Sequence, residues 1–139
     1  MIGLAMNPAY DAYMLSEHWR LLKSQLFTLR GHQCAICRHK GQFNPIVAHH
    51  LIYRTPLESG IVTDLMLVCL RCHDVIHAHV PPFPVETPTS ERYVRTVAQV
   101  RRYVFPEGLK IPPQSKPPRL SPSRKKWLKK HGFMPRAYR

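Results

Sequence analysis

Two Cys-x-x-Cys pairs, at 34–37 and 69–72, constrain the fold of this chain more than any other feature. Two thiolates separated by two residues on a tight turn can reach the same ion, so two such pairs can hold one tetrahedral zinc. The pairs contain all four cysteines of the chain, which favours metal-bound thiolates in a reduced, cytoplasmic compartment over disulfide bonds. We therefore predict a structural Zn²⁺ bound by Cys34, Cys37, Cys69 and Cys72.

Four histidines near the cysteine pairs are not needed for that zinc, namely His49, His50, His73 and His77. Residues four apart share one face of a helix, so His73 and His77 can hold a second ion together. A third ligand must come from another element, and the adjacent pair at 49–50 is the available source. Neighbouring side chains on a strand point to opposite faces, so one histidine of the pair can bind the ion while the other stays free.

A free imidazole, with an ordinary pKa of about 6.5, can take a proton from water near neutral pH. Two alternatives remain open: His50 is a packed strand histidine, or the four histidines are alternative ligands of the structural zinc. The other histidines have no spacing that joins them to this group, and we assign no site role to His18, His32, His39, His79 and His131.

The charge balance points to a polyanionic partner. The chain has 21 Lys and Arg against 8 Asp and Glu, a formal net charge of +13. Such a surplus most often indicates nucleic acid, and the alternative is a basic solvated surface without a specific partner. An open metal site beside a free base fits phosphodiester hydrolysis, in which an ion neutralises developing charge and the base activates water.

The amino-terminal part is expected to be helical. Asn7-Pro8 predicts a short helix over 8–14, and Ser16 is a candidate cap for a second helix that ends at Gly31. Apolar residues at helical spacing predict the buried face of the second helix: Trp19, Leu22, Leu26 and Leu29. Around the metal ligands we expect strand, loop, strand and helix, at 46–52, 53–61, 64–68 and 71–79.

Five segments follow from these patterns. They are an amino-terminal helical segment at 1–31, a metal-binding core at 32–80, a proline-rich linker at 81–89, a helix at 90–105 capped by Ser90, and a basic, proline-rich tail at 106–139. The start of the chain has no basic region followed by a long apolar one, and no apolar run approaches the roughly 20 residues of a membrane span. We therefore expect neither a signal peptide nor a membrane partner.

Basic side chains outside the core are candidates for phosphate contacts. On the helix at 90–105, an apolar stripe contains Tyr93, Val97, Val100 and Val104, whereas Arg92, Arg95 and Arg102 lie off it. These arginines belong to either a solvated or a phosphate-contacting face. Residues 110–139 carry ten Lys or Arg and no acid. Ser121-Pro122 and Gly132 predict a short basic helix there, which contains Lys125, Lys126, Lys129 and Lys130. We expect the tail either to be disordered until it binds nucleic acid or to serve only to keep the protein soluble.

Taken together, these residues resemble the HNH endonucleases of the ββα-metal (His-Me finger) type, in the phage and bacterial branch with a four-cysteine zinc knuckle. The resemblance covers residues 13–77, in Tyr13–Trp19, both cysteine pairs, Ala48–Tyr53, Asp64-Leu65, His73 and His77. It implies an α+β fold, a small ββα-metal finger with a zinc knuckle, flanked by amino- and carboxy-terminal helices.

The resemblance also implies residue roles. His49 matches a ligand of the catalytic ion, His50 the general base, and His73 and His77 the ligands on the helix. Asp64 stands at the motif's middle Asn, which orients the base by holding its loop through hydrogen bonds to the backbone. An ionised Asp can only accept such bonds. Arg54 is either a phosphate contact or a solvated loop arginine.

The activity implied is metal-dependent cleavage of DNA that leaves 5′-phosphate and 3′-hydroxyl ends, with RNA as a second candidate partner. Three imidazoles suit Mn²⁺, Ni²⁺ or Zn²⁺ better than Mg²⁺ as the divalent catalytic ion. Two other interpretations stay open. The chain is a zinc-knuckle module that binds nucleic acid without cutting, or a subunit of a phage or mobile-element machine that cuts with a partner. A double-strand break by single-metal sites implies a homodimer or successive nicks.

Overall fold

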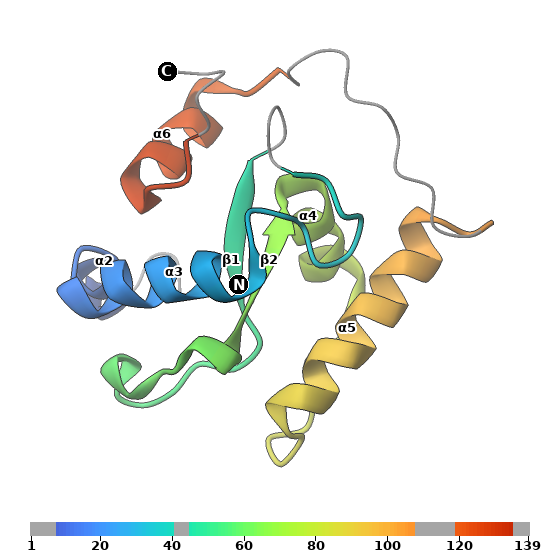
Figure 1. Ribbon diagram of the computed structural model, residues 1–139, viewed down its shortest axis with the longest axis horizontal. Helices are drawn as coiled ribbons and strands as arrows, with labels where there is room; N and C mark the ends of the chain where they lie inside the picture. The colour runs from blue at the N-terminus through green and yellow to red at the C-terminus, as the bar shows by residue number, and fades with distance from the viewer. Residues whose placement is uncertain (1–7, 41–44, 108–118, 135–139) are drawn as a thin grey trace.

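The computed structural model describes residues 8–40, 45–107 and 119–134, which form an α+β arrangement around a two-stranded antiparallel sheet (Figure 1). Within these ranges there are five α-helices: α2 (Pro8–Met14), α3 (Glu17–Arg30), α4 (Leu70–His79), α5 (Thr89–Val104) and α6 (Pro122–His131). The strands are β1 (Ile46–His50) and β2 (Leu65–Cys69), and two 3₁₀ turns, Leu57–Ser59 and Val62–Asp64, lie between them. No helix in the described residues is long and apolar enough to cross a bilayer.

The boundaries of α3 follow the sequence signals. The Ser16 hydroxyl accepts a hydrogen bond from the Trp19 amide, and Gly31, at φ 76°, ends the helix. Trp19, Leu22 and Leu26 are buried as predicted, but Leu29 is 57% exposed and its assignment to the core is wrong. Each residue advances about 100° around a helix, which puts Leu29 at the rim of the stripe formed by the other three.

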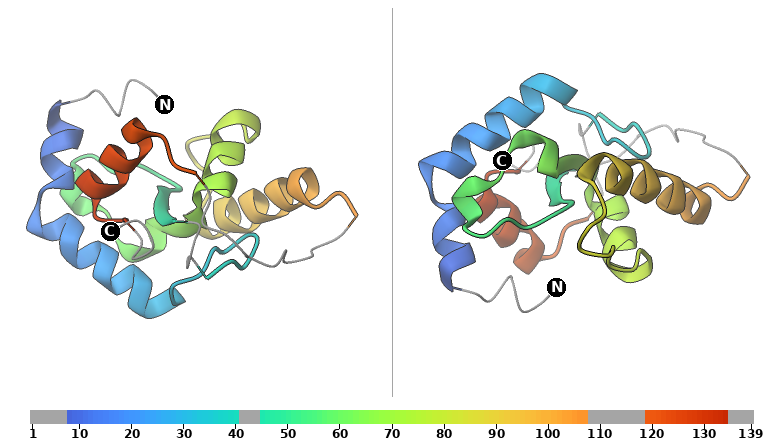
Figure 2. Two further views of the ribbon diagram at one scale, coloured as in Figure 1. Left: turned by 90° about the horizontal axis from the view of Figure 1, so that it is seen from above. Right: turned by 90° about the horizontal axis from the view of Figure 1, so that it is seen from below.

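The sheet joins the two halves of the metal-binding region. In the antiparallel register, Ile46 pairs with Cys69 and His50 with Leu65, so the histidine pair and the second cysteine pair lie at opposite ends of the ladder. Strand β1 is two residues shorter than expected, and β2 starts at Leu65 because Asp64 ends the preceding 3₁₀ turn. Helix α4 follows β2 directly and contacts both strands, and α5 packs against α4 on its far side (Figures 1 and 2).

Arg92 forms hydrogen bonds within the protein, and its predicted role in phosphate binding is wrong. Its side chain is buried, and its Nε donates to the Thr87 carbonyl at 2.9 Å and its Nη1 to the Leu51 carbonyl at 3.0 Å. Its Nη2 donates to the carbonyls of Pro84 and Val85. The donors that a phosphate would need already bind backbone oxygens, so Arg92 fastens the linker and the segment after β1 to α5.

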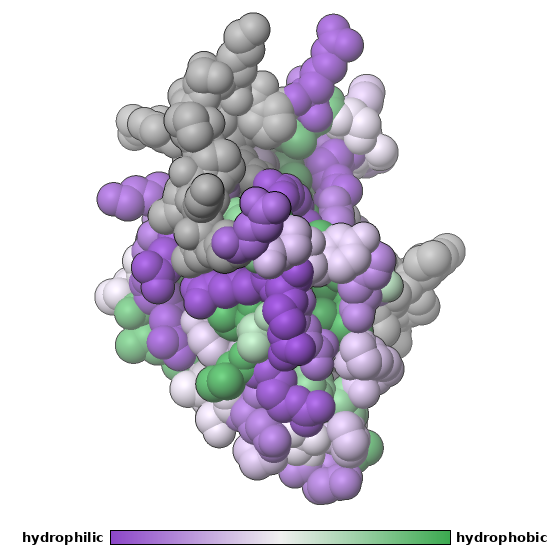
Figure 3. Space-filling view, turned by 90° about the vertical axis from the view of Figure 1, so that its right-hand side faces the viewer, coloured by the Kyte–Doolittle hydropathy of each residue, from purple (hydrophilic) through white to green (hydrophobic). Residues whose placement is uncertain are grey.

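The surface of α5 remains a candidate for phosphate contacts. The face of the molecule that carries α5 is mainly hydrophilic, with small apolar patches (Figure 3). Arg95 and Arg102 are exposed on this helix. Ser90 is not its cap, because the helix begins one residue earlier, at Thr89, with Pro88 at the cap position and no side-chain hydrogen bond there.

Replacing Arg92 by Gln should lower the free energy of unfolding by about 3 kcal/mol, because several buried carbonyls lose a charged donor. Chemical denaturation of the two proteins measures this difference. The matched control is Arg95→Gln, which removes the same charge from the same helix at an exposed position and should cost less than about 0.5 kcal/mol. Equal losses for the two variants would contradict an internal role for Arg92.

The carboxy-terminal basic helix is part of the folded core. Helix α6 begins after Ser121, whose hydroxyl accepts from the Arg124 amide, and ends at Gly132 in the left-handed region, as the sequence predicts. Leu128 is fully buried and Phe133 is 8% exposed. For residues 119–134, the expectation of a tail that is disordered in the free protein is therefore wrong. Figure 2 shows α6 lying beside α2 and across from α4.

Candidate metal centres and the adjoining cavity

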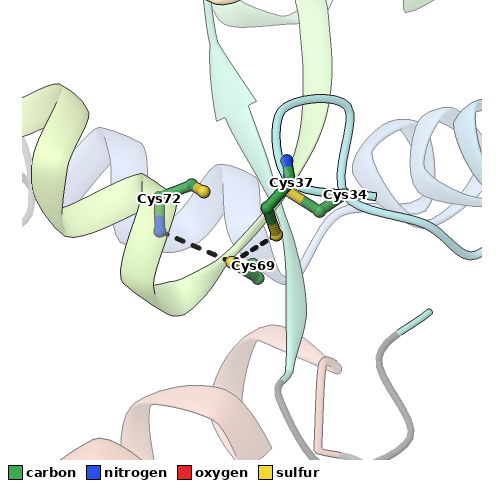
Figure 4. A group of neighbouring side chains, drawn as sticks. All are labelled: Cys34, Cys37, Cys69 and Cys72. Carbon is green, nitrogen blue, oxygen red and sulfur yellow. Dashed lines mark hydrogen bonds between the residues drawn. The ribbon is translucent and has the colours of Figure 1, made fainter. Parts of the chain in front are cut away.

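The four cysteines meet in one buried cluster (Figure 4). Cys34 and Cys37 come from the turn after α3, Cys69 ends β2, and Cys72 lies in the first turn of α4. Their sulfur atoms all lie within 4.8 Å of one another, and the Cys37 and Cys69 sulfurs are 3.6 Å apart. Thiolates on one tetrahedral zinc are about 3.8 Å apart, from a Zn–S distance of about 2.3 Å. The four cysteines can therefore hold a zinc ion.

The cluster needs a cation to carry four thiolates. Hydrogen bonds from the three neighbouring thiols lower the pKa of Cys34 far below its ordinary value. Once that charge is present, hydrogen bonding to Cys34 and burial raise the pKa of Cys69 and Cys72 strongly. Only a positive ion at the centre lets all four sulfurs ionise together. Backbone amides at Ile36, Cys37 and Cys72 donate to the sulfurs at 3.4 to 3.5 Å and support the same charge.

A second cluster consists of three histidines. His49 comes from β1, and His73 and His77 lie one turn apart on α4. One ring nitrogen of each lies within 4.8 Å of the others, and the Nε2 atoms of His73 and His77 are 3.0 Å apart. Imidazole nitrogens that share one ion at about 2.0–2.1 Å are roughly 3 Å apart. The structure thus brings together the three histidines that the sequence groups as ligands.

These imidazoles are in the protonation state that binds metal. Desolvation, followed by the charges of His73 and His77, holds the pKa of His49 well below its usual value. Desolvation and the neighbouring His77 lower the pKa of His73 to about 3. Neutral rings therefore face one another near neutral pH, which is the form that coordinates an ion.

His50 lies beside this cluster but has a different environment. Its ring is stacked between Trp19, at 5.6 Å between centroids and 16° between planes, and Tyr53, at 4.3 Å and 15°. Desolvation lowers the pKa of His50 to about 4, against an opposing effect of the Asp64 carboxylate. The ring is thus held in place and neutral near pH 7, as a proton acceptor requires.

Asp64 holds the loop that follows His50. Its buried carboxylate accepts hydrogen bonds from the Ile61 amide at 3.0 Å and from Nε and Nη2 of Arg54 at 3.0 and 2.9 Å. Burial opposes ionisation, but these hydrogen bonds and the Arg54 charge outweigh it and keep the pKa of Asp64 below its usual value. The Leu51 amide also donates to the Asp64 carbonyl, which closes the loop at its base.

This arrangement bears on both residues. Asp64 holds this loop by accepting hydrogen bonds, without donating any. The loop carries Tyr53, which stacks on the His50 ring. Arg54 binds Asp64 through two nitrogens, so this exposed loop arginine is ion-paired as well as solvated. Its side chain is still 41% exposed, and a phosphate contact by Arg54 stays a prediction.

One cavity of about 410 Å³ adjoins the histidine cluster and His50. Its walls are formed by β1, α2, α4 and α6, together with Tyr53 from the loop after β1. The sequence does not predict that α6 forms part of this cavity, with Arg124, Trp127 and His131, because the basic composition of the segment indicates a tail. The signal available was the pair Leu128 and Phe133, two apolar side chains within an otherwise basic stretch.

Comparison with known proteins adds no relative to these observations: no family model, no curated protein and no solved structure matches the chain. The two clusters are therefore interpreted from their own chemistry. A buried four-thiolate site has no open position and suits a structural zinc. A three-imidazole site at the wall of a cavity leaves coordination positions for water or substrate.

Proposed function

We propose that this protein is a metal-dependent endonuclease of the HNH type, which hydrolyses phosphodiester bonds in DNA. The observation that carries the proposal is the position of His50 next to the cluster of His49, His73 and His77 in one cavity. A nucleic-acid-binding module has no need of a three-imidazole site with a neutral, stacked histidine beside it. The net charge of +13 fits a polyanionic substrate.

The residues divide the chemistry between them. His49, His73 and His77 would hold one divalent ion, which supplies charge neutralisation at the scissile phosphate and the leaving oxygen. His50 takes a proton from the attacking water as the water oxygen bonds to phosphorus. The phosphorus–O3′ bond breaks, and the leaving O3′ takes a proton from solvent, which gives a 5′-phosphate and a 3′-hydroxyl. Trp19 and Tyr53 fix the ring plane of His50 during this step.

Exposed cations on α5 and α6 would supply sequence-tolerant contacts to the DNA backbone. They are Arg95, Arg102, Lys125, Lys126, Lys129 and Lys130. Arg54 would add a contact next to the base. Binding through such contacts releases counterions, so affinity should fall steeply as salt rises.

Cleavage of supercoiled plasmid tests the proposal. The protein, purified with its structural zinc, is incubated with plasmid alone, with EDTA for a short time, and with Mg²⁺, Mn²⁺, Ni²⁺ or Zn²⁺. We expect metal-dependent nicking, and more of it with Mn²⁺ or Ni²⁺ than with Mg²⁺, because neutral imidazoles are poor ligands for Mg²⁺. Equal or better cleavage with Mg²⁺ would contradict the metal preference alone.

The same assay separates the proposed enzyme from the other interpretations. Tight binding in a gel shift without cleavage under any metal would favour a nucleic-acid-binding module or a subunit that cuts only with a phage or host partner. The ratio of nicked to linear product reports whether one strand or both are cut. Cleavage of RNA in parallel reports whether the substrate class is wider than DNA.

A further inference from the structure

We propose that α6 makes the cavity a binding site for single-stranded nucleic acid. In this site, Arg124 and Lys130 bind the phosphates that flank the scissile one, and Trp127 stacks on a base. The inference rests on the proposed function, because it assigns the substrate class of the same site. All three side chains line the cavity. Their helix, α6, lies across from α4 (Figure 2).

The two cations are available for exchange. Arg124 pairs with Asp74 at 3.2 Å, and Lys130 pairs with Asp11 at 3.5 Å. The two acids are 55% and 38% exposed, and ion pairs at such positions are weak. A phosphate that enters the cavity can therefore replace either carboxylate at small cost and gains a charge-assisted hydrogen bond.

The attachment of α6 does not depend on these two cations. Leu128 is fully buried, and the Phe133 ring packs near Trp19 and Phe27. From α3, Lys23 donates to the His131 carbonyl at 2.8 Å. Because these contacts hold the helix from its other side, Arg124 and Lys130 can turn to a phosphate while α6 stays in place.

The size of the cavity and the aromatic side chain on its wall indicate one strand. A volume of 410 Å³ is that of a small-ligand site rather than of a cleft that could surround a duplex. With α6 docked, a duplex is too bulky to enter between α6 and the histidines, so a supercoiled plasmid would be cut where negative supercoiling opens its two strands. Trp127 is half-buried, with its ring centroid 6.4 Å from that of His73. Cations combined with accessible aromatic side chains are the usual means of binding single strands. Trp127 lines the cavity, and the His131 ring lies beside it at 4.4 Å between centroids.

Fluorescence anisotropy tests the site without any cleavage. The probes are a fluorescein-labelled oligothymidylate and a labelled duplex of the same length, with the full, zinc-loaded chain and no other divalent ion. The double variant Arg124→Gln/Lys130→Gln should bind the single strand about 25-fold more weakly at 0.1 M salt, with a salt slope shallower by about 1.4, the loss of two phosphate contacts. The matched control, Arg20→Gln/Lys40→Gln, removes the same charge from exposed positions that neither line the cavity nor belong to the proposed DNA contacts.

Trp127 gives an independent readout. Oligothymidylate should quench tryptophan fluorescence in a Trp19→Phe background, and Trp127→Leu should weaken single-strand binding about tenfold. Circular dichroism of each variant identifies any that fails to fold, and Trp127→Phe, which keeps a ring, should restore most of the affinity.

Three outcomes decide the inference. A larger loss for the cavity pair than for the control pair, together with quenching, supports it. Equal losses for the two pairs, or duplex binding as tight as single-strand binding with Trp127 unquenched, would overturn it. Because these measurements need no cleavage, single-strand binding as described with no cleavage of either plasmid or single-stranded DNA under any metal would contradict the proposed function and leave this binding site standing.

Discussion

Replacing Cys72 by serine should unfold the region around the sheet as well as the turn that carries the first cysteine pair. All four cysteines are buried, and two of them lie at the junction of β2 and α4. A structural zinc contributes about 10–16 kcal/mol, which equals or exceeds the total stability of about 5–15 kcal/mol typical of a domain. We expect less than one zinc per chain, and loss of the cooperative thermal transition in circular dichroism.

The matched comparison is His77→Ala, which removes an exposed member of the histidine cluster and leaves the four cysteines intact. This variant should keep one tightly bound zinc and a cooperative transition. Strong chelation of the wild type should reproduce the effect of Cys72→Ser. A zinc-free protein that still unfolds cooperatively at the wild-type temperature would contradict a structural role for the cluster.

The second large effect is expected for His50→Ala, which should reduce the rate of plasmid nicking by about 10²- to 10⁴-fold, the usual contribution of a general base. The imidazole fills the slot between Trp19 and Tyr53, so alanine also leaves a gap there. His50→Gln keeps polar bulk in the slot but offers no comparable base, and we expect the same loss of rate. Zinc content and gel-shift affinity of both variants should equal those of the wild type.

His79→Ala is the control for this pair. His79 stacks on Tyr103 at 3.9 Å, on the same helix as His73 and His77 but outside the cavity. Its removal should leave the nicking rate unchanged. Cleavage by His50→Ala at the wild-type rate would mean either a contaminating nuclease or a different base.

Features that depend on neighbouring residues could be predicted from the sequence. Ser16 and Gly31 mark the ends of α3 because capping is a local interaction, and the cysteine spacing reports a metal site because two residues of a tight turn define it. The proximity of His73 and His77 follows from helix periodicity. A metal site needs a third ligand from another element, and this requirement led to the prediction that His49 lies beside them.

Features that depend on distant contacts could not be predicted. Arg92 and Arg95 are the same residue type on one helix, but only Arg92 donates a hydrogen bond to the Leu51 carbonyl, 41 positions away in the chain. Net charge counts both alike. In the same way, the basic composition around Leu128 indicated a solvated tail, whereas contacts with α3 make α6 a wall of the cavity that includes His131, a residue to which no site role was assigned.

Helix α4 carries ligands of both clusters, with Cys72 and His73 adjacent in its first turns. If each cluster holds an ion, this one helix links the two binding equilibria. By thermodynamic reciprocity, whatever factor zinc at the cysteines adds to the affinity of the histidines for their ion, that ion adds to the retention of zinc. Any such coupling between two bound ions would pass through α4, because the two clusters share no residue.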